Sequence, residues 1–240
     1  GVVSKLGKGV TARQVGDEVV GMVQIGGFAS QVVASEYTTF LKGSSMSFEQ
    51  AAGFAVTYGT SYYALKQKAQ LQPGETVLVL GAAGGVGIAT IQIAKAMGAT
   101  VIAAASTEEK LDFACKAGAD LRINYSTDNL KEKVKELTKG KGADVIYDPV
   151  GGDFSEQAFR AIAWDGRFLV IGFASGPIPK MPLNLALLKG ASMVGVFWGA
   201  WSARDPKSSQ QNFKELIEMI DGGKFTPLVT EVYSLDDHSS

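Results

Sequence analysis

The sequence predicts an α/β fold built around a doubly wound parallel sheet of the Rossmann type. Between residues 77 and 197, short apolar runs of strand length alternate with segments of helical periodicity, which is typical of a parallel sheet covered on both faces. A glycine-rich turn, Gly81-Ala-Ala-Gly-Gly-Val-Gly87, follows the apolar run 77–80 without a spacer. A strand, a glycine turn, a helix and a strand within about 30 residues form the βαβ unit of a dinucleotide-binding domain.

Residues 1–45 are expected to form β structure, because short β-branched runs alternate with glycines. These runs are Val2-Val3, 19–23 and 31–33. The chain opens inside the first run without an initiator methionine, so we expect its start to be a cut.

The remaining elements follow from capping signals and periodicity. Ser47 and Gln50 match a capping box, residues 58–61 are expected to interrupt the helical region, and 62–70 to be helical up to Pro73. A helix at 88–97 ends at Gly98, and further helices are predicted around 111–115, 130–137, 153–162 and 213–220. Strands are predicted at 101–105, 121–125, 144–148, 167–172, 193–197 and 228–233. Asp153 and Glu156 fit a variant capping box, Asp165-Gly166 a turn, and 173–182 an irregular loop.

The glycine turn is suited to a pyrophosphate. Compared with G-x-G-x-x-G, residues 82–87 carry Ala82 in place of the first glycine. Gly84 would let the backbone approach the pyrophosphate, and Gly87 would let the helix pack closely on the strand. Free N–H groups and the positive end of the helix dipole would then face the phosphates.

Two other interpretations of this stretch are available. Residues 76–94 carry no charge and are long enough for a membrane span of about 20 residues, but the clustered glycines and Gln92 argue against one. Alternatively, the turn only packs an α/β sheet. The end of the second strand argues against that, because Ser106 and Lys110 stand where an NAD-binding fold would place a carboxylate. A hydroxyl and an ammonium suit a 2′-phosphate, so NADPH is predicted over NADH, although Lys110 could also be an ordinary solvated lysine.

Composition excludes several classes of function. The net charge is −1 without a basic block, so neither nucleic acid nor a membrane is expected as a partner. Cys115 and His238 are the only residues of their kinds, which excludes a Cys/His zinc site and leaves a Ser-His-Asp mechanism dependent on a histidine in a polar tail. No metal site is expected.

Ligands of parallel sheets bind at the carboxyl ends of strands. Tyr125, residues 149–152, residues 173–175 and Phe197-Trp198 stand at such ends and are therefore site candidates. The aromatic residues among them, Phe173, Phe197 and Trp198, could equally pack at the rim of a site or at an interface.

Five segments resemble the quinone oxidoreductase (zeta-crystallin-like) branch of the medium-chain dehydrogenase/reductase superfamily. They are residues 81–87, 104–110, 123–125, 147–152 and 194–199. The resemblance runs along essentially the whole chain. It implies part of a GroES-like β-barrel domain at 1–46, returning at 228–240, beside an NADP-binding Rossmann domain at 47–227. The zinc ligands of related dehydrogenases are absent, in agreement with the zinc-free branch.

The resemblance also implies which residues bind the coenzyme. Thr60, Phe173, Ala174 and Ser175 would flank the nicotinamide, and Ala83, Gly84, Gly85 and Val86 would hold the pyrophosphate. Ser106, Lys110 and Tyr125 would surround the 2′-phosphate and adenosine, and Val150 and Gly151 would touch the ribose. Phe197 would meet the carboxamide through its backbone, with Trp198 beside it as a further candidate.

These expectations lead to an NADPH-dependent oxidoreductase that transfers hydride to a quinone or an α,β-unsaturated carbonyl without zinc. The alternative is an NADPH-binding structural, redox-sensing or RNA-associated protein without useful catalysis. No catalytic residue is assigned, since Tyr58, Tyr62 and Tyr63 fit a proton donor only by type. A homodimer paired through residues 193–201 is predicted. The expected location is cytoplasmic, with the mitochondrial matrix as the alternative, because any targeting segment would precede Gly1.

Overall fold

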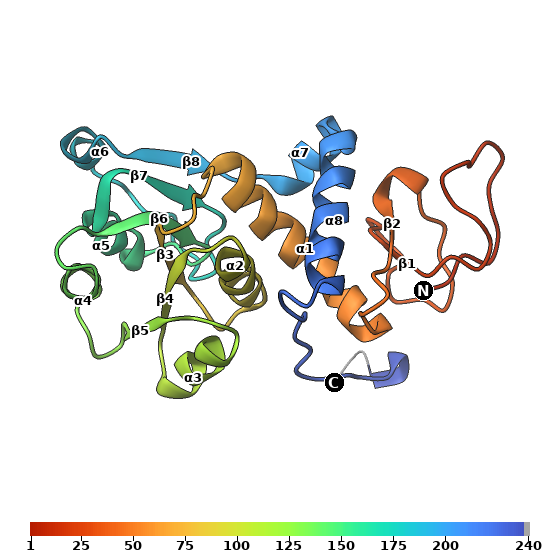
Figure 1. Ribbon diagram of the computed structural model, residues 1–240, viewed down its shortest axis with the longest axis horizontal. Helices are drawn as coiled ribbons and strands as arrows, with labels where there is room; N and C mark the ends of the chain where they lie inside the picture. The colour runs from red at the N-terminus through yellow and green to blue at the C-terminus, as the bar shows by residue number, and fades with distance from the viewer. Residues whose placement is uncertain (238–240) are drawn as a thin grey trace. The chain divides into compact units, whose positions relative to one another are not determined.

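The computed structural model describes residues 1–237 and divides into two compact units (Figure 1). One contains residues 1–59 and the segment from Ala200 on, and the other runs from Thr60 to Gly199. The predicted domain borders at 46/47 and 227/228 stay predictions.

The unit from Thr60 to Gly199 contains a six-stranded parallel sheet in the order β5-β4-β3-β6-β7-β8. Its strands are β3 (Thr76–Leu80), β4 (Thr100–Ala105), β5 (Leu121–Asn124), β6 (Ala143–Asp148), β7 (Ile162–Val170) and β8 (Ser192–Gly195). The chain starts in the middle, moves to one edge and then returns to fill the other half. This is the strand order of a Rossmann fold, with the switch point between β3 and β6. The predicted fold class is confirmed.

Helices cover both faces of this sheet (Figure 1). They are α2 (Gly85–Ala96), α3 (Glu108–Lys116), α4 (Leu130–Leu137), α5 (Asp153–Arg160) and α6 (Asn184–Lys189). Leu130 and Val134 of α4 and Phe159 of α5 join a buried cluster with Leu78 and Ile146 of the sheet. The strands are apolar on both faces because both are covered, as the continuous apolar runs predict.

Helix α1 (Phe48–Tyr63) begins at the predicted capping box and continues into a π-helical turn, η2 (Ala64–Lys68). The Ser47 N–H donates to Gln50 Oε1 (2.9 Å), and the Gln50 N–H donates to Ser47 Oγ (3.2 Å). The predicted interruption at 58–61 is wrong. Tyr58 and Tyr62 are buried, and this burial outweighs the weak helix propensity of Gly59.

In the described part of the unit formed by residues 1–59 and the segment from Ala200, β structure is limited to a short antiparallel pair and one isolated bridge. Strand β1 (Val19–Gly21) pairs with β2 (Thr39–Leu41), and Val2 bridges Glu18. The strands predicted at 31–33 and 228–233 are wrong, because neither segment pairs with a neighbour in the described residues, and Val33 is 96% exposed. The other elements of the chain are η1 (Glu36–Thr38), α7 (Trp198–Arg204), α8 (Pro206–Asp221) and η3 (Leu235–Asp237). In the predicted amphipathic helix α8, Phe213 stacks on Phe40, with ring centroids 3.8 Å apart.

Two local predictions are also wrong. Gly152, not Asp153, is the N-cap of α5, and Asp153 lies in the first turn. The segment Asp165-Gly166 is not a free turn, because β7 already begins at Ile162. Asp165 adopts a left-handed φ of 56° there, and the register with β6 shifts at that point. This is the signature of an irregularity inside a strand.

Candidate functional site

The carboxyl ends of the parallel strands meet at one edge of the sheet and carry nearly all the predicted coenzyme residues. Backbone N–H groups link neighbouring ends: Ala82 donates to Ala104 (3.1 Å), Tyr125 to Ala105 (3.1 Å), Ile171 to Asp148 (3.0 Å) and Val196 to Val170 (3.0 Å). The structure therefore brings together the glycine turn and the segments that follow β4 to β8. Thr60 comes from α1, next to Ser61, whose Oγ donates to the Val86 carbonyl (3.2 Å).

The glycine turn has the shape that the sequence predicts. A Cβ on Gly87 would lie 2.5 Å from the Gly81 oxygen and 2.7 Å from the Ala82 oxygen, so only glycine allows α2 to pack this closely on β3. Gly84 is the N-cap and supplies no side-chain acceptor to the first helical N–H groups. Both Gly84 and Gly85 are exposed. The start of α2 thus offers unsatisfied backbone donors to an anion from outside.

Ser106, Lys110 and Tyr125 gather at the ends of β4 and β5. Lys110 Nζ donates to Ser106 Oγ (3.2 Å), and Ser106 also hydrogen-bonds the Tyr125 side chain. Burial raises the pKa of the Tyr125 phenol above its ordinary value, against the lowering effect of Ser106. Tyr125 therefore stays neutral at physiological pH. The group presents a hydroxyl, an ammonium and a phenol side by side, and all three can donate to a phosphate.

Glu108, in the first turn of α3, is engaged by residues outside this group. Glu108 Oε1 accepts from Asn124 Nδ2 (2.8 Å), and its other oxygen lies 3.8 Å from Arg122. Among the ion pairs of the described residues, none involves Lys110, whereas Arg122 also pairs with Asp112 (2.6 Å). Lys110 is exposed. The ammonium group is therefore available to an external anion.

The turn after β6 is held by Asp148, which sequence reasoning missed. Its Oδ1 accepts from the N–H groups of Val150 and Gly151, both at 2.9 Å. Its Oδ2 accepts from the Ser155 hydroxyl at 2.5 Å. Asp148 is 3% exposed, and three donors stabilise the buried carboxylate. A carboxylate three residues before the first glycine of a pair was the available signal.

Residues 149–152 are joined to the loop after β7. The Ala174 N–H donates to the Pro149 oxygen (3.0 Å), and the Ser175 N–H donates to the Val150 oxygen (2.9 Å). Gly151 has a φ of 74°, and a Cβ there would lie 2.9 Å from the Phe173 ring. The predicted ribose and nicotinamide segments thus form one backbone-linked unit that requires glycine.

The predicted aromatic residues differ in exposure. The Phe197 side chain is 77% exposed and Phe173 39%, whereas Trp198 is buried at 7%. The ring of Trp198 therefore contributes to packing. The coenzyme contacts assigned to these residues stay predictions, like those of the other site residues.

Three buried hydroxyls behind the glycine turn were also missed. Ser61, Thr90 and Tyr147 hydrogen-bond one another on three different elements. Nothing in their spacing could reveal this, because Ser61 and Tyr147 are 86 positions apart.

The tyrosines proposed as proton donors by type are buried. Tyr58, Tyr62 and Tyr63 are 4–6% exposed. Burial raises the pKa of Tyr58 strongly, against a hydrogen bond from the backbone at Leu228. These side chains serve packing, and the proton donor stays unassigned.

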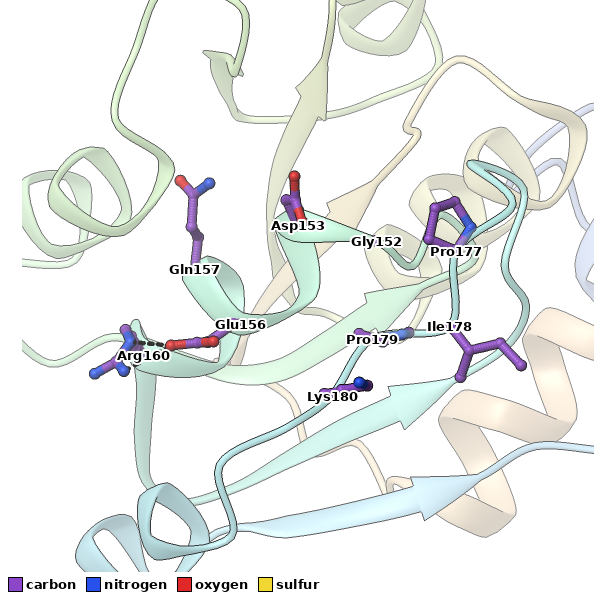
Figure 2. A pocket seen from close by; sticks show the side chains of 9 residues that line it. All are labelled: Gly152, Asp153, Glu156, Gln157, Arg160, Pro177, Ile178, Pro179 and Lys180. Carbon is purple, nitrogen blue, oxygen red and sulfur yellow. Dashed lines mark hydrogen bonds and ion pairs between the residues drawn. The ribbon is translucent and has the colours of Figure 1, made fainter.

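A surface hollow of about 500 Å³ adjoins the turn after β6 (Figure 2). Its lining residues are Gly152, Asp153, Glu156, Gln157, Arg160, Pro177, Ile178, Pro179 and Lys180. Glu156 and Arg160, one turn apart on α5, form an ion pair at 2.6 Å (Figure 2). The hollow shares only Gly152 with the segments expected to bind coenzyme.

Residues 1–237 contain no group of three or more His, Cys, Asp or Glu side chains placed to hold a metal ion. His238 lies outside the described residues. Of the helices in residues 1–237, none combines the length and apolar character needed to cross a membrane.

Comparison with known proteins identifies the family. The sequence profile described as zinc-binding dehydrogenase matches residues 85–222. The chain is 42% identical over 238 residues to the quinone oxidoreductase-like protein 2 homolog of Nematostella vectensis, covering 98% of this chain but 65% of that protein. The chain thus spans slightly less than two thirds of this relative's length.

Two solved structures support the same family assignment. The quinone oxidoreductase of Escherichia coli complexed with NADPH matches with a TM-score of 0.86 and 32% identity, over 96% of this chain and 71% of that one. The CurK enoyl reductase matches with a TM-score of 0.86 and 31% identity, over 97% and 69%. The strand order, the glycine turn and these similarities have one common explanation: the chain belongs to the quinone oxidoreductase branch of the medium-chain dehydrogenase/reductase superfamily, a family of oxidoreductases.

Proposed function

We propose that this protein transfers hydride from NADPH to a quinone or an α,β-unsaturated carbonyl, without zinc. The observation that carries the proposal is the Ser106–Lys110 pair beside Tyr125 at the end of β4. An NAD-binding fold places a carboxylate at this position to bind the ribose 2′-hydroxyl. Here the group consists of donors, and the carboxylate of Glu108, in the first turn of α3, is engaged by Asn124. The bound NADPH of the E. coli relative supports the same coenzyme.

The residues fit NADPH along the whole edge of the sheet. The exposed start of α2, capped only by Gly84, would bind the pyrophosphate. The linked turns after β6 and β7 would hold the ribose and nicotinamide through backbone groups. NADPH supplies the hydride chemistry when bound, and the protein orients it and limits access of water.

The acceptor is proposed from the names of relatives. A quinone oxidoreductase and an enoyl reductase share the fold at more than 30% identity. For a quinone, solvent can supply the proton, so the absence of an assigned general acid is compatible with turnover. Zinc independence is supported by the presence of a single cysteine and a single histidine in the chain.

Two measurements test this function. NADPH oxidation is followed with 1,2-naphthoquinone and with a 2-alkenal, and turnover with at least one is expected. The rate should not change after dialysis against a zinc chelator. Tight NADPH binding without turnover on either acceptor would contradict the enzymatic proposal and support the coenzyme-binding alternative.

We also propose a homodimer. Strand β8 is an edge strand, and apolar side chains near it are exposed, among them Trp164 (71%), Leu187 (82%) and Phe197 (77%). Sedimentation at micromolar concentration should show a dimer. A monomer alone at that concentration would remove this proposal.

A further inference from the structure

Three buried hydroxyl groups meet directly behind the glycine turn. Ser61 lies on α1, Thr90 on α2 and Tyr147 on β6, and each is completely buried. Ser61 Oγ lies 3.1 Å from the Tyr147 hydroxyl and 3.0 Å from Thr90 Oγ1. Ser61 and Thr90 both reach the carbonyl oxygen of Val86, at 3.2 Å and 2.7 Å.

The protons of this group can be arranged so that every hydroxyl has a partner. Each hydroxyl has one proton to donate. If Tyr147 donates to Ser61, Ser61 and Thr90 can direct their protons toward the Val86 carbonyl. Burial raises the pKa of Tyr147 to about 12, against hydrogen bonds with Ser61 and Thr90, so the phenol keeps its proton. Every buried hydroxyl then has a partner, and the chain of hydrogen bonds ends on the glycine turn.

The position of Ser61 distinguishes this group from ordinary packing. The preceding residue, Thr60, is expected beside the nicotinamide, and Val86 is expected at the pyrophosphate. Tyr147 directly precedes Asp148, which holds the turn expected at the ribose. One serine therefore connects the segments expected to contact three successive parts of the coenzyme.

We propose that Ser61 is a positioning residue, which holds Thr60 and the turn at Val86 in register for the pyrophosphate and nicotinamide half of NADPH. This inference rests on the proposed function. It assigns no direct contact between the Ser61 side chain and the coenzyme, because that side chain is fully buried.

The test compares two ligands on the same variants. NADPH spans the whole proposed site, whereas adenosine 2′-monophosphate, which has no 5′-phosphate, reaches only the end formed by Ser106, Lys110 and Tyr125. Ser61→Ala should weaken NADPH binding about 3- to 10-fold, which corresponds to one or two neutral hydrogen bonds. Binding of adenosine 2′-monophosphate should stay within about 2-fold, as expected for a distant site.

A second pair of variants consists of a further test at Thr90 and a matched control at Thr57. Thr90→Val removes one hydroxyl without a change of shape and should weaken NADPH binding about 2- to 5-fold. Thr57 makes the same kind of helical bond, from its hydroxyl to the Gly53 carbonyl at 2.7 Å, but belongs to no part of the proposed site. Thr57→Val should leave both ligands bound as in the wild type.

The outcomes separate the two proposals. If the wild-type protein binds neither NADPH nor adenosine 2′-monophosphate, the proposed function fails. If it binds both, and Ser61→Ala retains wild-type NADPH affinity or loses both ligands equally, the positioning role is overturned. Should Ser61→Ala not fold, Tyr147→Phe and Thr90→Val carry the test, and a selective loss of NADPH is again required.

Discussion

The two ends of the proposed coenzyme site are built in different ways. At the end of β4, recognition depends on partly exposed side chains, with Lys110 and Ser106 in contact at 3.2 Å. At the ends of β6 and β7, it depends on backbone conformation, because the buried Asp148 and the left-handed Gly151 shape a turn whose side chains are secondary. Substitutions at the side-chain end can change specificity without loss of stability. Substitutions at the backbone end affect folding and binding together.

The largest expected effect is a loss of stability at Asp148, the buried residue at the end of β6. Asp148→Ala leaves two N–H groups and one hydroxyl without their acceptor, so the free energy of unfolding should fall by about 3 kcal/mol or more. Urea denaturation measures it. The control, Asp112→Ala, removes an exposed partner of Arg122 and should cost about 1 kcal/mol or less. Similar losses in the two variants would contradict the assigned role of Asp148.

The same comparison can be tested by substitutions in the glycine turn, where α2 begins. Gly87→Ala places a methyl group against two carbonyl oxygens and should lower stability by about 1–3 kcal/mol, with loss of NADPH binding. Gly53→Ala is the same exchange on α1, with nothing within 4 Å of the new Cβ. It should instead stabilise by about 0.5–1 kcal/mol. Thermal denaturation of the two variants gives the difference, and shifts of the same sign would refute the packing argument.

At the exposed end, the expected change is in specificity. Lys110→Glu should weaken NADPH binding about 10- to 100-fold, because a charge-assisted contact is replaced by repulsion. NADH affinity and the melting temperature should change little. Lys116→Glu, at the other end of α3, is the control. Calorimetric titration with both coenzymes measures the effect, and an equal loss for NADH would exclude a 2′-phosphate contact.

The smallest effect is expected at Glu75, which directly precedes the amino end of β3. Burial alone would raise the pKa of Glu75, but the paired guanidinium of Arg167 (2.7 Å) and the Gln72 N–H hold it below its ordinary value. Because the folded-state pKa is depressed, this stabilisation is present above the unfolded pKa and is lost as pH falls through the folded value. In Glu75→Gln, the decrease of stability with acidification should become shallower, while coenzyme binding stays constant. An unchanged acid profile would show that the pair contributes nothing.

The sequence predicts the sheet unit well and the other unit poorly, for a physical reason. Strands such as β3 and β4 are apolar on both faces, so their composition alone identifies them. Segments 31–33 and 228–233 have strand composition but pair with no other segment of residues 1–237, and pairing is a long-range property. Likewise, the interruption expected at Gly59 depends on local propensity, which the burial of the neighbouring tyrosines overrides.

The candidate site shows the same division. The positions of the glycine turn, Ser106 and Tyr125 follow from the rule that ligands lie at the carboxyl ends of parallel strands. The support beneath them could not be predicted, since Asp148 acts through backbone groups and Ser61 through a tyrosine 86 positions away. Motifs identify the groups that face a ligand more readily than the buried groups that hold them.

The backbone hydrogen bonds between residues 149–150 and 174–175 also have a consequence for the sequence variation that this protein can tolerate. Since the loop conformation depends on main-chain groups and glycines, exposed neighbours such as Ile178 (73%) can vary without disturbing it. Random libraries at such positions should therefore yield mostly folded variants. The fold separates a turn held by its backbone from exposed side chains that can vary, a favourable starting point for directed evolution.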